Sequence, residues 1–320
     1  MSINYLCLKF FCHSHSFYAG YKKYSEMKIK EKFRNILISK PLNRRLIRPL
    51  RNIKFIFPFH YLSRIPIIGE FSFTNGDSKL IKFTSNGYDP TANLLHWSNG
   101  KNYEPNIINL LHKLGAEAQV LFDVGANTGI ISIEMALLPA AKAVYAFEPL
   151  SRAFEALKKN LEINNLSNCF AHQIALGDSN KTSKLYVPNV EAIPTSASLS
   201  PDFYPDHTEI EVEITTLDNF VEKNNIKCLD IVKIDVEGCE LAVLGGMETT
   251  IRKFRPLIIC EILPRTGDLK KVYKLLQIHG YYMYEILDHC INPIEDINKY
   301  QRNRCIDLLL SPIQQVDLNT

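Results

Sequence analysis

The sequence lacks the features that mark several classes of protein. Its N-terminal apolar run, Leu6 to Phe11, is interrupted by Lys9, is too short to span a membrane and has no positive charge before it, so it makes a poor signal peptide. The eight cysteines include no C-x-x-C pair, and the Cys and His residues between positions 7 and 15 match no familiar zinc spacing. We therefore expect a soluble cytoplasmic protein with reduced cysteines, no cleaved leader and no bound metal.

The small net charge of +3 conceals an uneven distribution. Residues 1–54 hold 13 Lys and Arg against two acidic residues, so the remaining 266 residues carry 24 basic and 32 acidic side chains. The basic residues in segment 22–54 alternate with apolar ones, which suits either a solvated helical lead-in or peripheral contact with an anionic membrane. Nucleic acid is the least favoured partner, because no aromatic residues accompany the charge to stack on bases. Met27 offers an alternative start of translation, which would leave residues 1–26 out of the protein.

After this basic extension, residues 55–100 predict a small cap that contains a β-hairpin. Two alternating stretches, Ile65 to Phe73 and Lys79 to Thr84, flank a turn at Asn75-Gly-Asp77. The only tryptophan, Trp97, is expected to pack rather than to contact a substrate. The remaining part of the chain, 101–320, reads as one catalytic domain.

The stretch from residue 120 to 129 is the most informative part of that domain. An apolar run that includes Asp123 has the composition of a buried parallel strand, and Gly125 and Gly129 let the backbone turn sharply beneath a ligand. The apolar helix predicted after this turn would point its N-terminal amides at the ligand. A second apolar run ends at Glu148, nineteen residues after Gly129, where a carboxylate is needed to accept hydrogen bonds from ribose hydroxyls. The sequence therefore predicts a site for a nucleoside cofactor.

The spacing of the glycines distinguishes two classes of cofactor. The dinucleotide pattern G-x-G-x-x-G would require glycine where Asn127 and Ile130 stand, because a pyrophosphate must approach the backbone closely. A cofactor without phosphates, such as S-adenosylmethionine, needs less of this anion cradle, and Asp123 would suit its ammonium group. Near the third strand, Asp178 either accepts a hydrogen bond from the adenine amine or belongs to a turn. The expected cofactor contacts are Asp123, Gly125, Ala126, Asn127, Gly129, Glu148, Pro149, Ala175 and Asp178.

Six motifs follow one another in a characteristic order. They are Asp123-Val-Gly-Ala-Asn-Thr-Gly129, Phe147-Glu-Pro149, Asn160 to Asn164, Ala175-Leu-Gly-Asp178, Thr216-Leu-Asp218 and Lys233-Ile-Asp-Val-Glu-Gly-Cys-Glu240. Over roughly residues 95 to 312 the chain thereby resembles the FkbM family of S-adenosylmethionine-dependent methyltransferases, and the last motif carries most of the specificity. The resemblance implies O-methylation of a hydroxyl on a sugar or natural-product acceptor. The alternatives are a non-catalytic protein that binds S-adenosylmethionine or a nucleoside and, more weakly, an NAD-dependent dehydrogenase.

The predicted elements beyond residue 101 alternate between strands and helices. Strands are expected near 120–124, 143–148, 169–175, 230–235 and 256–262, with helices near 129–138, 150–164, 240–253 and 268–279. An excursion at 181–217 interrupts the rhythm, and 281–287 with 305–310 reads as a terminal antiparallel pair. We therefore expect a Rossmann-like class I methyltransferase fold of the α/β class: a doubly wound, mostly parallel, seven-stranded sheet with an antiparallel C-terminal strand, preceded by a basic helical and β-hairpin extension.

The expected reaction centre lies where the strand around 230–235 ends, because ligands of open α/β sheets bind outside the carboxyl ends of the strands. A buried lysine, Lys233, needs a partner, and Asp235 or Glu237 is nearest in sequence. Methyl transfer from a sulfonium requires alignment and a base for the alcohol proton, a role for which we favour Asp235, followed by Glu237. A purely structural ion pair is the alternative. The expected substrate contacts are Ser198, Asp218 and Glu261, although Asp218 would equally cap the helix that follows it.

Overall fold

The structure, a computed structural model, describes residues 63, 65–200, 206–263, 268–288, 290–300 and 305–316. The basic segment 22–54 and the predicted boundary after residue 54 lie outside these residues. The described chain divides into two compact units. One contains the described residues up to Tyr103 together with Glu191–Ile193, and the other contains Glu104–Val190 and the residues from Pro194 onward. Each unit is described by itself below.

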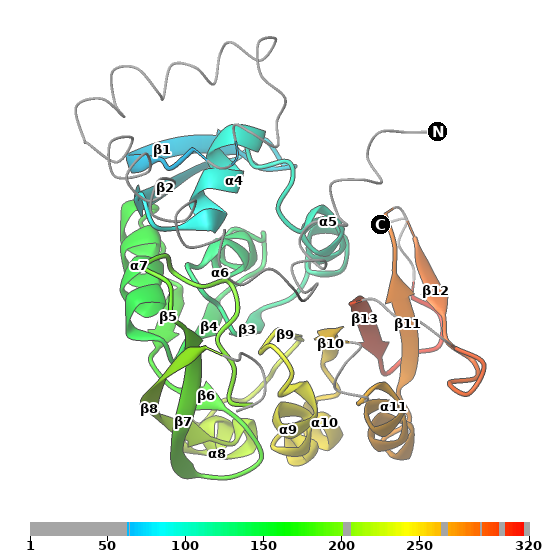
Figure 1. Cartoon of the computed structure of the whole chain (residues 1–320). Helices are drawn as coiled ribbons and strands as arrows, with labels where there is room; N and C mark the ends of the chain where they lie inside the picture. Colours follow the sequence, from blue (N-terminus) through cyan, green and yellow to red (C-terminus); the bar gives the residue numbers. More distant parts are fainter. Residues whose placement is uncertain are drawn as a thin grey trace. The chain divides into compact units, whose positions relative to one another are not determined.

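The first unit contains the predicted hairpin and one helix. Strands β1 (Ile68–Thr74) and β2 (Leu80–Asn86) pair antiparallel, and α4 (Pro90–Ser98) follows them (Figure 1). Alternate side chains of both strands are buried, as the sequence pattern predicts. Helix α4 begins at Asp89, whose carboxylate accepts a hydrogen bond from the backbone of the first turn.

The tryptophan of this unit has a packing role. Trp97 is 4% exposed, and its indole nitrogen donates a hydrogen bond of 3.0 Å to the carbonyl oxygen of Ile65. Its ring also makes an edge contact with the ring of His96. The structure thus agrees with the expectation that Trp97 packs.

The second unit contains the alternating strands and helices. In chain order they are α5 (Pro105–Leu114), β3 (Val120–Val124), α6 (Ile130–Ala136), β4 (Ala143–Phe147), α7 (Ser151–Ile163), β5 (Cys169–His172), β6 (Ala175–Leu176), β7 (Lys181–Pro188), β8 (His207–Thr215), α8 (Leu217–Lys223), β9 (Ile231–Ile234), α9 (Glu240–Gly245), α10 (Glu248–Phe254), β10 (Leu257–Ile262), α11 (Leu269–Ile278), β11 (Tyr282–Ile286), β12 (Ile291–Pro293) and β13 (Ile306–Ser311).

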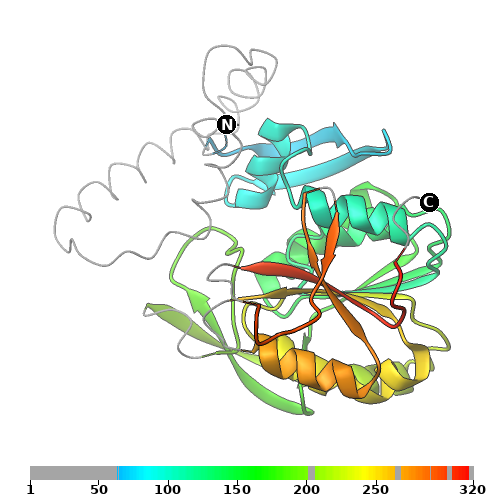
Figure 2. The ribbon, with the colours of Figure 1, turned by 90° about the vertical axis from the view of Figure 1, so that its right-hand side faces the viewer.

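The main sheet of this unit has eight strands in the order β12-β11-β13-β10-β9-β3-β4-β5. The five strands from β10 to β5 are parallel, and β13 lies antiparallel between β10 and β11. Helices α5 and α6 cover one face of the sheet, and α9 and α11 cover the other (Figure 2). This is the doubly wound α/β fold with an antiparallel C-terminal strand that the sequence predicts. The sheet has one strand more than expected, because β12 adds three residues beside β11.

Aromatic and aliphatic side chains between the sheet and the helices form the core. The rings of Phe122 and Phe147, on adjacent strands, lie 5.4 Å apart, and Phe220 of α8 packs edge-on against Phe147 at 4.8 Å. All three are buried. Closely packed rings therefore hold β3, β4 and α8 together near the loops that follow β3 and β4.

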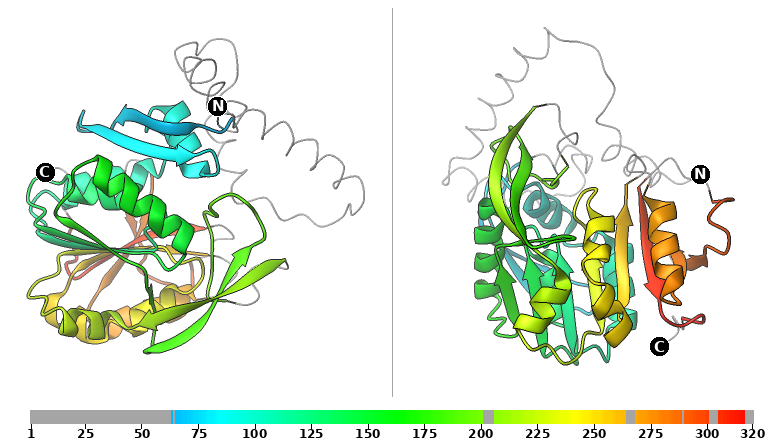
Figure 3. Two further views of the ribbon diagram at one scale, coloured as in Figure 1. Left: turned by 90° about the vertical axis from the view of Figure 1, so that its left-hand side faces the viewer. Right: turned by 90° about the horizontal axis from the view of Figure 1, so that it is seen from below.

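Two predicted elements are divided in the structure. The third strand breaks after His172, because β6 leaves the main sheet and pairs with β8 of a small second sheet, ordered β6-β8-β7. The β7–β8 hairpin extends away from the main sheet (Figure 3). The single helix expected at 240–253 is two helices, α9 and α10, that meet at Gly246. A Cβ atom on Gly246 would lie 1.9 Å from the carbonyl oxygen of Gly177, so this close approach requires glycine there.

Candidate functional site

A small cavity lies at the carboxyl ends of β3, β4 and β9, the edge of the sheet where ligands of open α/β folds bind. Its volume is about 60 Å³. Its lining residues are Val124, Gly125, Asn127, Phe147, Glu148, Pro149, Leu150, Ile174, Ala175, Leu176, Leu185, Pro194, Thr195, Ala197, Leu199, Asp235, Val236 and Glu237. Most of this wall is apolar, and its charged side chains are carboxylates.

The turn after β3 forms one wall of the cavity. The backbone amides of Gly125 and Ala126 both donate to the carbonyl oxygen of Phe147, each at 3.0 Å, which ties the turn to the end of β4. Gly125 and Gly129 have φ angles of 87° and 95°. A Cβ on Gly125 would lie 1.8 Å from the carbonyl oxygen of Asp235, and one on Gly129 would lie 2.4 Å from the side chain of Leu157. The sequence pattern suggests that these glycines leave room for a ligand. The structure shows a further reason for glycine at both positions, because a side chain would clash with the end of β9 or with α7.

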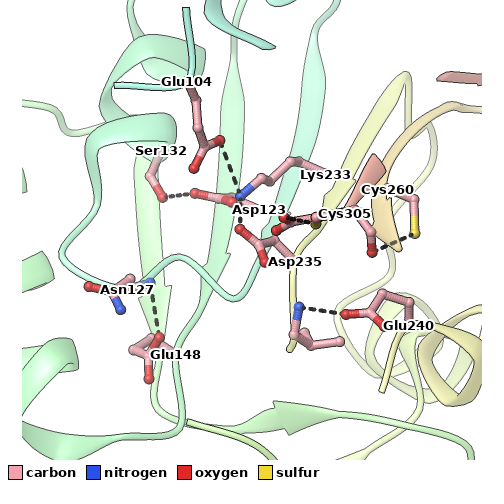
Figure 4. Close-up of polar contacts among 12 residues, drawn as sticks. Glu104, Asp123, Asn127, Ser132, Glu148, Lys233, Asp235, Glu240, Cys260 and Cys305 are labelled. Atoms are coloured by element: carbon pink, nitrogen blue, oxygen red, sulfur yellow. Dashed lines mark hydrogen bonds and ion pairs between the residues drawn. The ribbon is translucent and has the colours of Figure 1, made fainter. Parts of the chain in front are cut away.

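Glu148 presents its carboxyl group at the tip of β4. Its oxygens accept hydrogen bonds from the backbone amides of Asn127, at 2.9 Å, and Leu150, at 2.8 Å (Figure 4). The residue is only 7% exposed, and burial raises the pKa of its carboxyl to about 7 although both hydrogen bonds favour the ionised form. Glu148 is thus held rigidly at the cavity, in the position expected for a ribose acceptor.

A short loop closes the other side of the cavity. The Asn127 side chain donates to the carbonyl oxygen of Pro194 at 3.0 Å. The hydroxyl of Ser198 donates to the backbone carbonyl oxygen of Glu237 at 2.7 Å. Ser198 is fully buried, and its hydroxyl also accepts from the amide of Ser200. Ser198 therefore anchors this loop, and its contact with a substrate stays a prediction.

Asp123 lies away from the cavity. The Ser132 hydroxyl donates to one of its oxygens at 2.5 Å, while the other oxygen is buried without a hydrogen-bond partner. Burial is the largest influence on this carboxyl and raises its pKa, which outweighs the opposing effect of the nearby Lys233 ammonium. The carboxyl thus contacts α6 through one oxygen, and its contact with the ammonium group of a cofactor stays a prediction.

The other predicted cofactor contacts fall into two groups. Gly125, Asn127, Glu148, Pro149 and Ala175 line the cavity, whereas Asp123, Ala126, Gly129 and Asp178 do not. Asp178 is exposed and interacts with Ser179 and Lys181, at 2.8 and 3.3 Å, and these hydrogen bonds lower its pKa. This matches the alternative of a turn residue. Binding of a cofactor by any of these residues stays a prediction.

Lys233 lies among carboxylates from three parts of the chain. Its ammonium is 2.8 Å from the Asp235 carboxylate and 3.8 Å from that of Glu104, and its side chain is 6% exposed (Figure 4). The register of β3 and β9 also places Asp123 directly beside Lys233. The expected pairing of Lys233 with Asp235 is present. Glu104 has no sequence signal, because it precedes α5 and reaches the site only through the fold.

Asp235 and Glu237 both line the cavity, as predicted for reacting residues. Burial opposes the ionisation of Asp235, but the charge and hydrogen bond of Lys233 together with a hydrogen bond from Glu261 hold its pKa below the ordinary value. Glu237 follows in a strained left-handed conformation with φ of 55°. The loop between β9 and α9 therefore places two acidic residues in the wall of the cavity.

Glu240 binds the backbone of this loop through its carboxylate. Its carboxylate accepts from the amide of Gly238 at 2.8 Å and from that of Val236 at 3.4 Å. The residue is 1% exposed, and burial raises its pKa to about 7. The Glu240 side chain thus fixes the loop that carries Asp235 and Glu237.

The remaining substrate predictions have different outcomes. The Asp218 carboxylate accepts from the amides of Thr249 and Thr250, at 2.9 and 2.7 Å, so it caps α10, while Thr216 caps α8. Asp218 therefore caps a helix, which is the alternative to a substrate contact. The helix it caps is α10, however, and not α8, which directly follows it in the sequence. Glu261, at the end of β10, is hydrogen-bonded to Asp235 at the same edge of the sheet.

The chemistry of the lining decides which cofactor suits the cavity. Its ionisable side chains are Glu148, Asp235 and Glu237, and no Lys, Arg or His occurs among the described lining residues. Phosphates need positive charge or a helix N-terminus with free amides, whereas ribose hydroxyls and a sulfonium suit carboxylates. The apolar wall, including Phe147, Ile174 and Leu185, suits a purine base. The residues present thus fit a phosphate-free nucleoside such as S-adenosylmethionine.

Within the described ranges, three or more His, Cys, Asp or Glu side chains nowhere gather in a geometry that would hold a metal ion. Of the helices whose positions are described, none combines the length and apolar character that crossing a bilayer requires.

Known proteins resemble this chain in sequence and in structure. Methyltransferase 1 of Beauveria bassiana is 25% identical over 50% of this chain and 71% of its own length. The 31-O-demethyl-FK506 methyltransferase FkbM of Streptomyces tacrolimicus is 26% identical over 51% and 72%, and the hexuronic acid methyltransferase AglP of Haloferax volcanii is 32% identical over 54% and 67%. The crystal structure of methyltransferase FkbM from Methylobacillus flagellatus aligns with a TM-score of 0.43 and 16% identity, over 61% of this chain and 44% of that protein.

The family assignment rests on the sequence profile of the methyltransferase FkbM domain. The profile matches residues 123–283, half of the chain, from the strand that precedes the cavity to β11. The matched region therefore contains the turn at Gly125, the carboxylate of Glu148 and the loop from Asp235 to Glu240. On these grounds the chain belongs to the FkbM methyltransferase family.

Proposed function

We propose that the chain transfers a methyl group from S-adenosylmethionine to a hydroxyl group of a sugar or natural-product acceptor. One observation carries the choice of cofactor: the cavity at the strand ends has the buried carboxylate of Glu148 at the tip of β4 and no basic side chain among its described lining residues. A ribose needs such a carboxylate, and a pyrophosphate would need the opposite charge. The NAD-dependent alternative therefore has less support than S-adenosylmethionine.

The proposed acceptor group is a hydroxyl. The name of the Streptomyces relative gives a demethylated FK506 as its substrate, and that of the Haloferax relative gives a hexuronic acid. Both compounds carry hydroxyl groups, which supports an oxygen acceptor for this chain. A small molecule and a glycoconjugate remain equal candidates.

The proposed roles of the residues follow from their positions. Bound S-adenosylmethionine supplies an electrophilic methyl group on a sulfonium. Asp235 is the candidate base that takes the hydroxyl proton of the acceptor as its oxygen is methylated, with Glu237 as the second candidate. Lys233 keeps Asp235 ionised and fixed in place. Because an oxygen that has gained a methyl group loses its proton readily, position matters more than basicity for this residue.

Calorimetry on the whole chain tests the cofactor assignment. We expect S-adenosylmethionine and S-adenosylhomocysteine to bind and NAD to give no heat of binding. Binding of NAD in preference to both would overturn the assignment. If S-adenosylmethionine binds, transfer of tritium from its labelled methyl group to sugar and polyketide acceptors distinguishes an enzyme from a non-catalytic binding protein.

The cellular setting is also a proposal. We propose that the reaction occurs in the cytoplasm and that the basic segment 22–54, which lies outside the described residues, brings the chain to an anionic membrane surface. Sedimentation of the full chain with vesicles tests this. Binding to anionic vesicles that is lost at high salt supports the proposal, and equal binding to zwitterionic vesicles contradicts it.

A further inference from the structure

Three carboxyl groups lie in a row across neighbouring strands beside the candidate base. The register of β10 and β13 pairs Glu261 with Asp307. Cys260 of β10 pairs with Ile234 of β9, so the next residues of these parallel strands, Glu261 and Asp235, also lie side by side. Like charges directly opposite one another on a sheet repel each other. Glu261, between two other carboxyl groups, therefore has the greatest reason of the three to remain protonated.

The hydrogen bonds of Glu261 show where such a proton lies. The Glu261 side chain is hydrogen-bonded to that of Asp235, and one of its oxygens accepts from the thiol of Cys305. Two ionised carboxylates have no hydrogen between them, so the bond requires one of them to carry a proton. Asp235 has Lys233 as a cationic partner at 2.8 Å, whereas Glu261 has no cation within ion-pair distance in the described structure. The proton therefore belongs to Glu261.

The electrostatic surroundings agree with this assignment. Burial, followed by the charges of Asp235 and Asp307, raises the pKa of Glu261 well above its ordinary value. The other ionisable groups near this end of β10 in the described part of the chain are the Cys260 and Cys305 thiols and Glu240 at the start of α9, and Glu104 faces Lys233 from the other side. The one cation described among these side chains is Lys233, which lies against Asp235.

We propose that Glu261 is a positioning residue that stays protonated at neutral pH and donates its proton in a hydrogen bond to Asp235, so that the pair carries one negative charge at the edge of the cofactor cavity. Lys233 holds Asp235 from one side and Glu261 holds it from the other. Asp235 then has a fixed orientation and a single protonation state. The inference rests on the proposed function only for the purpose that it gives to Asp235.

The pair also accounts for the proton released by methyl transfer. As the acceptor oxygen forms its bond to the methyl carbon, the carbon–sulfur bond breaks and its electron pair stays on sulfur. The oxygen–hydrogen bond of the acceptor breaks, and its proton passes to Asp235. The pair then holds two protons, one of which leaves to water and restores the single negative charge.

Carbon-13 NMR on the chain without any ligand tests the pair. With glutamate labelled at its carboxyl carbon, the signal that Glu261→Gln removes should remain in its protonated position at neutral pH, where exposed glutamates are ionised. Glu148→Gln and Glu240→Gln identify the other two glutamates whose pKa burial raises, so their signals are not confused with that of Glu261. In Asp235→Asn the Glu261 signal should titrate at lower pH, because the neighbouring charge is gone. A Glu261 signal that titrates with the exposed glutamates overturns the proposal.

The positioning role has its own readout at Asp235. With aspartate labelled at its carboxyl carbon, Glu261→Ala should raise the midpoint of the Asp235 titration by about one pH unit, since a hydrogen-bond donor to the ionised form is lost. Glu261→Gln keeps an amide donor and should restore the midpoint. A midpoint that is the same in all three proteins contradicts positioning by Glu261.

Two controls keep these outcomes separate. Circular dichroism verifies that each variant is folded, and if the Glu261 variants are not, the Glu261 signal is followed in Asp307→Asn, which should lower its titration midpoint. No cofactor or acceptor is present in the titrations. Absence of S-adenosylmethionine binding would therefore reject the proposed function without affecting the proton-sharing pair. Conversely, a Glu261 signal that titrates with the exposed glutamates would reject the pair without affecting the proposed function.

Discussion

The carboxyl group of Glu148 has two states near neutral pH, and a ribose distinguishes them. The ionised form can accept hydrogen bonds from both ribose hydroxyls, whereas the protonated form has lost one acceptor site. With a pKa of about 7, the residue changes between these states within the physiological range. A nucleoside that binds the ionised form must therefore displace a proton below pH 7.

This change of state predicts a pH dependence of cofactor binding. The affinity for S-adenosylhomocysteine should be about tenfold higher at pH 8 than at pH 6, because the ionised fraction of a group with a pKa of about 7 rises about tenfold over that range. Glu148→Gln should bind weakly and without this dependence, as measured by calorimetry.

Glu240→Gln is the matched control, because Glu240 titrates at a similar pH but does not line the cavity. It should keep the pH dependence of the wild-type chain. If Glu148→Gln binds with unchanged affinity, the ribose contact assigned to Glu148 is wrong.

Single residues also show what sequence reasoning can and cannot reach. The position of Glu148 follows from the length of one β-α-β unit, so the sequence predicts it. Glu104 and Cys305 lie 129 and 72 positions away from Lys233, in no recognisable spacing to the motif, and only the fold brings them to the strand ends. Asp123 shows a different case: its motif position suggests a ligand, the fold gives one of its oxygens a hydrogen bond from Ser132, and its contact with a cofactor stays a prediction.

At the scale of elements, the loop at residues 194–199 controls access to the cavity. The cavity of about 60 Å³ is far below the roughly 300 Å³ at which pockets for small molecules begin, so a nucleoside requires the loop to move. Hydrogen bonds from Asn127 to Pro194 and from Ser198 to Glu237 hold the loop in place. Opening must break at least one of these bonds.

Removing one of these bonds should therefore speed binding. In Ser198→Ala the association rate constant for S-adenosylhomocysteine should rise several-fold, since a net hydrogen bond contributes about 1 kcal/mol to the closed loop. Surface plasmon resonance measures the rate. Ser179→Ala is the control, because this serine donates its hydroxyl to its neighbour Asp178 and does not line the cavity. An unchanged rate in Ser198→Ala means that the loop does not limit entry.

The first turn of α10 depends on a side chain from another element. Asp218→Ala should lower the free energy of unfolding by about 1 to 2 kcal/mol, because the amides of Thr249 and Thr250 lose their acceptor. Urea denaturation measures this loss, and Asp218→Asn should retain part of the stability. The affinity for S-adenosylhomocysteine should not change. A stable variant with altered binding would instead support the role beside the substrate.

The elements that the sequence predicts best are those whose pattern is local. Strands β3, β4, β9 and β10 are short apolar runs between turns, and each lies within two residues of its predicted position. The division of 240–253 at Gly246 was not predicted, because it depends on the approach of Gly177 from another loop. The cap of α10 by Asp218 has the same cause, a contact between segments that lie about 30 residues apart.

At the scale of the molecule, among the described buried carboxyl groups whose pKa is shifted, those with a raised pKa outnumber those with a lowered one. Burial raises the pKa of Asp123, Glu148, Glu240 and Glu261, whereas partners lower that of Asp235. A group with a raised pKa holds more protons in the folded chain than in the unfolded chain. Its contribution to stability is complete below the unfolded pKa and is lost as the pH rises through the folded pKa.

The chain should therefore become less stable as the pH rises from about 4.5 to 8. For Glu148 and Glu240, a pKa raised from 4.5 to about 7 corresponds to a loss of about 3 kcal/mol each, as an upper estimate. His172, whose pKa burial lowers, acts in the opposite direction below pH 6.5 and reduces the net change there. Urea denaturation at pH 5 and pH 8 should show a free energy of unfolding that is several kcal/mol lower at pH 8. In a double variant with Glu148→Gln and Glu240→Gln, the difference between pH 5 and pH 8 should be much smaller than in the wild-type chain. An equal difference in the wild-type chain and the double variant would mean that other groups cause the pH dependence.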